Sequence, residues 1–106
     1  MKTKQKTYEL LSMKLKVVYK DRVENEDGIW QFGQCRFDAN NATIEISLFS
    51  DDGRKLSNEE IELTLRHELF HFILDTLYFR ECSANETLVE WLSTATSVLN
   101  KQGLKI

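Results

Sequence analysis

The chain has 106 residues and a formal net charge of −3, so the default expectation is one compact domain spanning residues 1–106. Hydrophobic residues make up 42% and charged residues 29%; with no proline and four glycines, this argues against disordered, collagenous and low-complexity classes. The acidic balance also argues against general nucleic-acid binding, which needs a basic surface to replace phosphate counterions.

The N-terminal segment is basic up to Lys6, but no uninterrupted apolar run follows it, so neither a signal peptide nor a membrane span is expected. Residues 2–13 are compatible with a short helix or with an extended arm. The two cysteines, Cys35 and Cys82, are too few for a disulfide framework. They are expected as reduced thiols in a cytoplasmic protein, with a Cys35–Cys82 bridge as the alternative.

The first half of the chain has the pattern of β-strands. Strands are expected over residues 14–20, 29–37 and 43–49, with turns between them at residues 27–28 and 38–41. In the third strand, Ile44, Ile46 and Leu48 alternate with polar residues, as in a sheet with one buried face. Gly33, inside the second strand, predicts a bulge or a close approach of another backbone.

The second half has the pattern of two helices. Ser57 and Glu60 form a capping box that predicts a helix running to about Tyr78. Ser83 and Glu86 repeat this signal before a second helix over residues 87–101, whose expected apolar stripe consists of Leu88, Leu92, Ala95 and Leu99. Strands followed by helices indicate an α+β fold, in which the helices cover one face of a small antiparallel sheet of about three strands.

The first predicted helix contains the motif His67-Glu68-Leu69-Phe70-His71, which is H-E-x-x-H. Two histidines four residues apart lie one helical turn from each other, so both imidazoles can reach one metal ion, and Glu68 can reach a water beside it. These are the only histidines of the chain. Chance would place two histidines four apart about once in fifty sequences of this length, so the motif indicates a zinc site.

The rest of the helix supports this interpretation. At about 100° per residue, one arc roughly 100° wide collects the polar residues Thr64, His67, Glu68, His71, Asp75 and Tyr78. Large apolar residues flank this arc on both sides. A mostly buried helix whose polar strip lines a cleft has this pattern.

A hydrolytic zinc site needs a third protein ligand and an open position. The longer H-E-x-x-H-x-x-G-x-x-H pattern is excluded because the chain has Leu74 and Leu77 at the positions of the glycine and the third histidine. With no further histidine, the third ligand is a carboxylate or Cys82. The candidates are Glu86, Glu90, Asp75, Glu81 and Cys82.

The segment Asn85-Glu-Thr-Leu-Val-Glu90, downstream of H-E-x-x-H, resembles the corresponding segment of the gluzincin metallopeptidases. Residues 28–100 are most similar to the minimal, zincin-like gluzincins of phages and mobile elements that are related to the ImmA/IrrE peptidases. The resemblance implies Zn²⁺ as cofactor, Glu86 as its third ligand, Glu90 as the carboxylate that orients His67, and Asn85 as the support of His71.

The resemblance further implies a zinc-dependent endopeptidase with Glu68 as general base and a peptide or protein as substrate. The strand over residues 43–49 is the expected edge of the cleft, where an extended substrate would add by backbone hydrogen bonds. Tyr78, Tyr8 and Tyr19 are candidate donors to the oxyanion. The alternative function is a metal-holding domain that binds a peptide or protein without cutting it.

Overall fold

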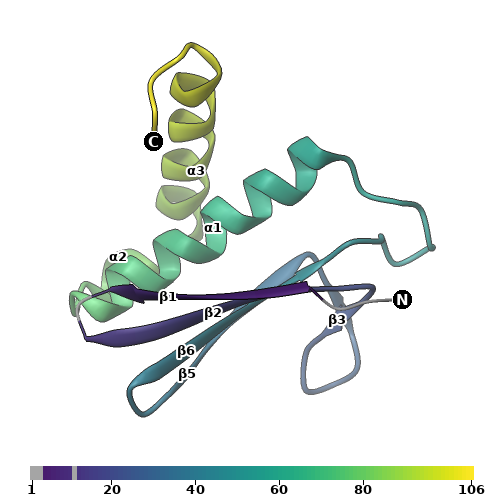
Figure 1. The fold of residues 1–106 in the computed structure, drawn as a ribbon, viewed down its shortest axis with the longest axis horizontal. Coiled ribbons are helices and arrows are strands. Elements are labelled where there is room, and N and C mark those ends of the chain that lie inside the picture. Colours follow the sequence, from purple (N-terminus) through teal and green to yellow (C-terminus); the bar gives the residue numbers. More distant parts are fainter. Residues whose placement is uncertain (1–3, 11) are drawn as a thin grey trace.

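The computed structural model describes residues 4–10 and 12–106 and has an α+β fold with a mixed sheet. The strands are β1 (Lys4–Leu10), β2 (Met13–Lys20), β3 (Val23–Glu24), β4 (Trp30–Gln31), β5 (Gly33–Asp38) and β6 (Asn41–Ser47). The helices are α1 (Asn58–Thr76), α2 (Arg80–Ala84) and α3 (Glu86–Lys101). Figure 1 shows α1 lying across the sheet, with α3 rising away from it.

The sheet differs from the predicted antiparallel arrangement of about three strands. It has four strands in the order β1-β2-β6-β5, and β3 and β4 form a separate two-stranded ribbon. β2 and β6 are parallel, whereas β1 and β5 pair antiparallel with their neighbours. Alternation of apolar and polar residues determines which side chains share a face, but it does not determine which strand lies beside which. The prediction of a purely antiparallel sheet was therefore wrong.

The additional strand β1 lies in the segment for which the sequence allows a helix or an extended arm. Residues 4–10 pair with β2 along their whole length, from Lys4 opposite Tyr19 to Leu10 opposite Met13. Residues 2, 3 and 11 of that segment lie outside the described residues. The extended alternative is therefore the one that the described part of the segment adopts.

The face of the sheet toward α1 holds the apolar core. Ile44 and Ile46 of β6 are fully buried, as the alternation predicts, and they pack with Phe72 of α1. Leu15 and Val17 of β2 complete the centre of this cluster. Burial of these side chains holds α1 against the sheet, and this attachment determines where the polar strip of α1 lies.

On the opposite face of the sheet, the carboxylate of Glu45 is buried among polar partners from both neighbouring strands. It accepts hydrogen bonds from Lys20 Nζ at 2.9 Å and Gln34 Nε2 at 2.8 Å, and Arg36 Nη2 lies 2.8 Å from it. Burial raises the pKa of Glu45, but the hydrogen bonds and the two cations outweigh it and lower the pKa below the usual value of 4.5. The ionised form of Glu45 therefore stabilises the fold.

Replacing Glu45 by glutamine is expected to lower the free energy of unfolding at neutral pH by roughly 1–3 kcal/mol, because a charge-assisted network is lost. The folded-state pKa of Glu45 is depressed, so its stabilisation is present above the unfolded-state pKa and disappears as the pH falls through the folded-state value. Urea unfolding of both proteins between pH 7 and pH 3 checks this. A difference that stays constant over that range would contradict it; Glu9→Gln on exposed β1 is the control.

α1 begins where the sequence predicts. The Ser57 side chain accepts a hydrogen bond from the Glu60 backbone N–H, and the Glu60 carboxylate accepts from the Ser57 backbone N–H, so the capping box is confirmed. The helix ends at Thr76, two residues before the predicted end. The chain then turns through Tyr78, which has a positive φ of 65° and therefore cannot continue the helix.

The start of the last helix differs from the prediction. Ser83 lies inside the short helix α2, and Asn85 is the N-cap of α3, with its side-chain oxygen accepting a hydrogen bond from Leu88 N at 3.0 Å. Both Ser83 and Asn85 are good capping residues, so the local pattern alone does not choose between them. The predicted Ser83 cap was wrong, and its hydroxyl is free for another contact.

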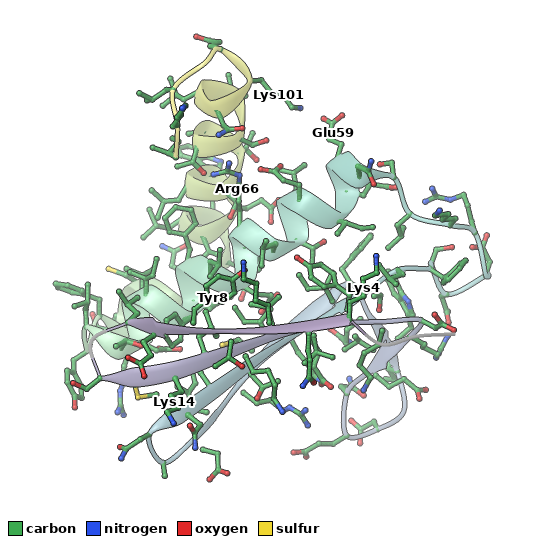
Figure 2. All side chains as sticks on the ribbon, viewed as in Figure 1. Lys4, Tyr8, Lys14, Glu59, Arg66 and Lys101 are labelled. Carbon is green, nitrogen blue, oxygen red and sulfur yellow. The ribbon has the colours of Figure 1, made fainter. Side chains whose placement is uncertain are left out.

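The buried face of α3 also differs from the prediction. Val89, Ser93 and Ser97 are buried, whereas Ala95 and Leu99 of the predicted stripe are exposed. Small serine side chains allow α3 to pack closely on α1, and Ser97 Oγ donates to Glu62 at 3.1 Å. Further along, Lys101 reaches Glu59 at 2.8 Å, a pair labelled in Figure 2. At the start of the same helix, Glu86 and Glu90 contact His67 of α1.

Candidate metal centre

α1 brings the two histidines of the motif together. Their Nε2 atoms lie 3.2 Å apart, and the rings meet edge to face with centroids 4.9 Å apart. Both side chains are mostly buried, with 20% of His67 and 17% of His71 exposed. The one-turn spacing of the motif therefore gives the geometry that the sequence predicts.

Glu86, the first residue of α3, supplies the third group. Its Oε2 atom lies 3.0 Å from His67 Nε2, and its Oε1 atom lies 3.2 Å from His71 Nε2. One ligand atom from each of these three residues lies within 4.8 Å of the others, so the group could hold a metal ion. The Glu86 side chain is 68% exposed, which leaves the site open to solvent on the α3 side.

The chemistry of the three groups also favours a cation between them. Glu90 Oε2 lies 2.9 Å from His67 Nδ1, and a carboxylate can only accept a hydrogen bond, so Nδ1 carries the proton. The Nε2 atom of His67, on the other side of the ring, faces the Glu86 carboxylate and His71 Nε2. A metal ion between these groups would take a lone pair from each imidazole Nε2 and from the carboxylate. Two imidazoles and a carboxylate fit zinc.

Two further residues hold the imidazole rings from behind. Glu90 contacts His67, at the position that the gluzincin resemblance gives it. His71 is different: its Nδ1 atom lies 3.1 Å from the hydroxyl of Ser83, whereas Asn85 caps α3. The expectation that Asn85 supports His71 was therefore wrong. Sequence reasoning missed Ser83 because Ser83 also fits a helix cap; its place twelve residues after His71 gives no separate signal.

Glu68 is buried beside the histidines, with 8% of the residue exposed. Burial raises the pKa of its carboxyl group to about 7; the neighbouring His67 lowers the pKa and Glu86 raises it. Glu68 is not a member of the three-residue group that could hold a metal. It can exchange a proton with a molecule bound beside that group.

Gly33 makes room for Glu68. A Cβ atom at this position would lie 2.7 Å from Thr64 Cγ2, 2.9 Å from the Glu45 carbonyl oxygen and 3.4 Å from Glu68 Cγ. No other residue fits here without moving a backbone atom. The close approach that the sequence predicts at Gly33 therefore brings the start of β5 directly against α1.

Replacing Gly33 by alanine is expected to destabilise the fold by about 1–3 kcal/mol, because the added methyl group overlaps a carbonyl oxygen and a side chain. Thermal unfolding measures the loss. Gly28→Ala is the comparison: its φ is +77°, but no atom of the described residues lies within 4 Å of the added Cβ, so only the backbone cost of about 1 kcal/mol applies. If the Gly33→Ala variant has the same midpoint temperature of unfolding as the wild-type chain, the close packing of β5 on α1 is contradicted.

A hollow of about 390 Å³ lies at the N-terminal half of the polar strip, next to His67 and Glu68. We call it the proximal hollow; it is lined by Gln31, Phe32, Gly33, Glu60, Leu63, Thr64, His67, Glu68 and Glu90. Thr64, His67 and Glu68 all belong to the predicted polar arc. The prediction that this arc lines a cleft is confirmed for these three residues.

The other candidates for the third ligand and for the oxyanion donor lie outside the metal group and the proximal hollow, apart from Glu90, which lines the hollow. Among the described residues, the group that could hold a metal includes none of Asp75, Glu81, Cys82 and Glu90. Both cysteines are free thiols. Tyr78 is 80% exposed beyond the end of α1, and Tyr8 and Tyr19 lie on β1 and β2. None of the three tyrosines lines the proximal hollow.

The strand beside the cleft is β5. The predicted edge strand, residues 43–49, corresponds to β6, which lies between β2 and β5 and has no free edge, so that prediction was wrong. β5 is an edge strand and contacts α1. The Phe32 carbonyl accepts a hydrogen bond from Ser47 N, so by alternation the backbone groups of Gly33, Cys35 and Phe37 point to the free edge.

Comparisons of this chain with protein-family models, with curated proteins and with solved structures find no match. Of the helices in residues 4–10 and 12–106, none combines the length and the apolar character needed to cross a lipid bilayer. The function is therefore inferred from the residues of the site itself.

Proposed function

We propose that this chain is a zinc-dependent endopeptidase of the gluzincin type, with a zincin-like fold and Glu68 as general base. The observation that carries the proposal is the convergence of His67, His71 and Glu86 beside a buried carboxylate that is not part of the group. A purely structural metal site has four protein ligands and no use for such a carboxylate. Three ligands, an open side and an adjacent base are the parts of a hydrolytic zinc site.

His67, His71 and Glu86 would hold the ion, with Glu90 and Ser83 fixing the orientation of the two imidazoles. When bound, zinc lowers the pKa of a water to about 7 and polarises the carbonyl group of the substrate. Glu68 would accept a proton from the attacking water and deliver it to the leaving nitrogen of the peptide. Its burial beside His67 favours this role, because a desolvated carboxylate is a stronger proton acceptor.

The substrate would bind as an extended segment along the free edge of β5. The outward backbone groups of Gly33, Cys35 and Phe37 can each pair with a peptide strand. The start of β5 passes next to Glu68, so a peptide on this edge would lie beside the base. Strand addition explains why an unpaired strand edge borders the cleft.

A specific observation favours the alternative function, a metal-holding domain that binds a peptide without cutting it. Beyond the metal group, a peptidase needs a donor that stabilises the developing oxyanion. In the described part of the chain, no tyrosine or third histidine lines the proximal hollow. Binding along β5 needs no such donor, so strand addition alone would satisfy this alternative.

Cleavage of a synthetic library of random dodecapeptides by the zinc-loaded full chain separates the two functions. The endopeptidase proposal predicts internal cuts that stop when a chelator removes the zinc and resume when zinc is restored. Mass spectrometry of the products detects them. Peptide binding by the zinc-loaded chain without any cut would contradict the endopeptidase and support the binding domain.

A further inference from the structure

A second hollow lies at the opposite end of the polar strip, beyond the C-terminal end of α1. We call it the distal hollow; its volume is about 620 Å³ and it is lined by Met13, Phe37, Ala39, Asp75, Thr76, Tyr78 and Arg80. Asp75 and Tyr78 belong to the polar arc predicted from the sequence, like Thr64 of the proximal hollow. The metal group lies between the two hollows along α1.

The same strand connects the two hollows. Gly33, at the start of β5, lines the proximal hollow, and Phe37, near its end, lines the distal hollow. Between them the free backbone edge of β5 is continuous. At about 3.3 Å per residue, a peptide paired with β5 covers the distance from Gly33 to Ala39 with about six residues. One extended peptide can therefore reach both hollows.

The lining of the distal hollow is mostly apolar and aromatic. The Phe37 ring stacks on buried Phe72 with centroids 6.0 Å apart, so Phe37 has a fixed position although 44% of it is exposed. The Tyr78 ring is 80% exposed, and the Arg80 guanidinium lies 5.9 Å from its centre. Exposed rings at the rim of a hollow offer stacking area for a large apolar side chain.

The backbone at this hollow is strained on both sides. Ala39 has a φ of 51° and Tyr78 a φ of 65°, and both line the distal hollow. Residues with a side chain adopt this conformation at a cost of order 1 kcal/mol, and such residues are concentrated at binding sites. The positive φ of Tyr78 presents its ring at the rim without burying it.

From these observations we infer that the distal hollow is a second subsite for the same extended peptide and binds a large apolar or aromatic side chain. This inference rests on the proposed binding of a peptide along β5. Antiparallel pairing is the more stable arrangement, so the side chain would lie on the N-terminal side of the residue at the metal group, about three to five residues away.

The test uses the Glu68→Gln chain, loaded with zinc and immobilised, to capture peptides from the random dodecapeptide library. The captured peptides are expected to show two enriched apolar positions about four or six residues apart, one for each hollow, because side chains on one face of an extended peptide recur every second residue. In the double variant Glu68→Gln/Tyr78→Gly, the enrichment of apolar residues at the position that reaches the distal hollow is expected to fall about tenfold. The enrichment at the position that reaches the proximal hollow should remain. Glycine fits the positive φ of residue 78, so this variant keeps the fold. Tyr8→Ala, on β1, is the matched aromatic control.

A single enriched position, two positions that persist in the Tyr78→Gly variant, or no captured peptide would overturn the inference. Cleavage by the wild-type chain is read separately. Capture with both positions but without wild-type cleavage keeps the second subsite and contradicts the endopeptidase. Cleavage at sites that show no preference for an apolar residue at the position of the distal hollow would support the endopeptidase and overturn the second subsite.

Discussion

Replacing Glu86 by alanine is expected to weaken zinc binding by about 100- to 1,000-fold. The free energy of structural zinc binding, ~10–16 kcal/mol, divided among four ligands gives about 3 kcal/mol for each ligand. Glu86 is one of the three groups that converge here among the described residues. Glu90→Ala and Ser83→Ala remove a partner behind one imidazole and should cost about 10- to 100-fold. Competition with a chromogenic chelator measures all three affinities.

Glu81→Ala and Asp75→Asn are the controls for this series. The sequence leaves both carboxylates as candidates for the third zinc ligand, but neither belongs to the group of His67, His71 and Glu86 in the structure. Their replacement should therefore not change the zinc affinity. Glu86→Gln keeps the size of the side chain and checks that any loss does not come from the start of α3. If Glu90→Ala loses more zinc affinity than Glu86→Ala, the assignment of the third ligand is wrong.

Replacing Glu68 by glutamine is expected to lower the turnover of peptide cleavage by about 10²- to 10⁴-fold, the usual contribution of a general base. Glutamine keeps the shape of the side chain beside Gly33 and His67 but cannot accept the proton. Zinc content and thermal stability should remain close to the wild-type values, because Glu68 is not part of the metal group. Steady-state kinetics on one peptide identified from the library gives the ratio.

Glu62→Gln is the matched control on the same helix. Glu62 pairs with Arg66 and Ser97, away from the metal group, so its replacement should leave turnover unchanged. Equal turnover of the Glu68→Gln and wild-type chains would remove Glu68 from the mechanism. Loss of zinc together with activity in Glu68→Gln would show that Glu68 supports the site instead of acting as its base.

The features that could be predicted from the sequence are those with a short spacing along the chain. The capping box of Ser57 and Glu60 is formed within one helical turn, and the approach of His67 to His71 follows from the same geometry. The close packing at Gly33 also has a local signal, since a glycine inside a strand pattern has few other causes. In each case the decisive contact is with neighbouring residues or needs no particular partner.

The sheet order and the packing of α3 depend on contacts between distant segments. Nothing in residues 41–47 shows that β2 lies beside them in parallel, and this pairing is what places β5 at the edge. For α3, the most apolar stripe is not the buried one, because the serines at 93 and 97 let this helix approach α1. That orientation brings Glu86 to the histidines.

The predicted roles of Ser83 and Asn85, one as helix cap and the other as support of His71, were interchanged for a similar reason. Both residues suit a helix N-cap, and only the three-dimensional structure decides that Asn85 caps α3 while the Ser83 hydroxyl reaches His71. The gluzincin resemblance placed Glu86 and Glu90 near the histidines, where the structure also has them. It could not supply Ser83, because no residue of the segment that carries the resemblance corresponds to it.

Elemental analysis of the full chain, purified without added metal, measures directly whether the site holds zinc. We expect one zinc ion per chain, retained in the Glu68→Gln variant and lost in the Glu86→Ala variant. A chain that carries no metal and takes up none when zinc is supplied, or one that keeps its zinc when Glu86 and both histidines are replaced, would contradict the assignment of His67, His71 and Glu86 as a metal centre.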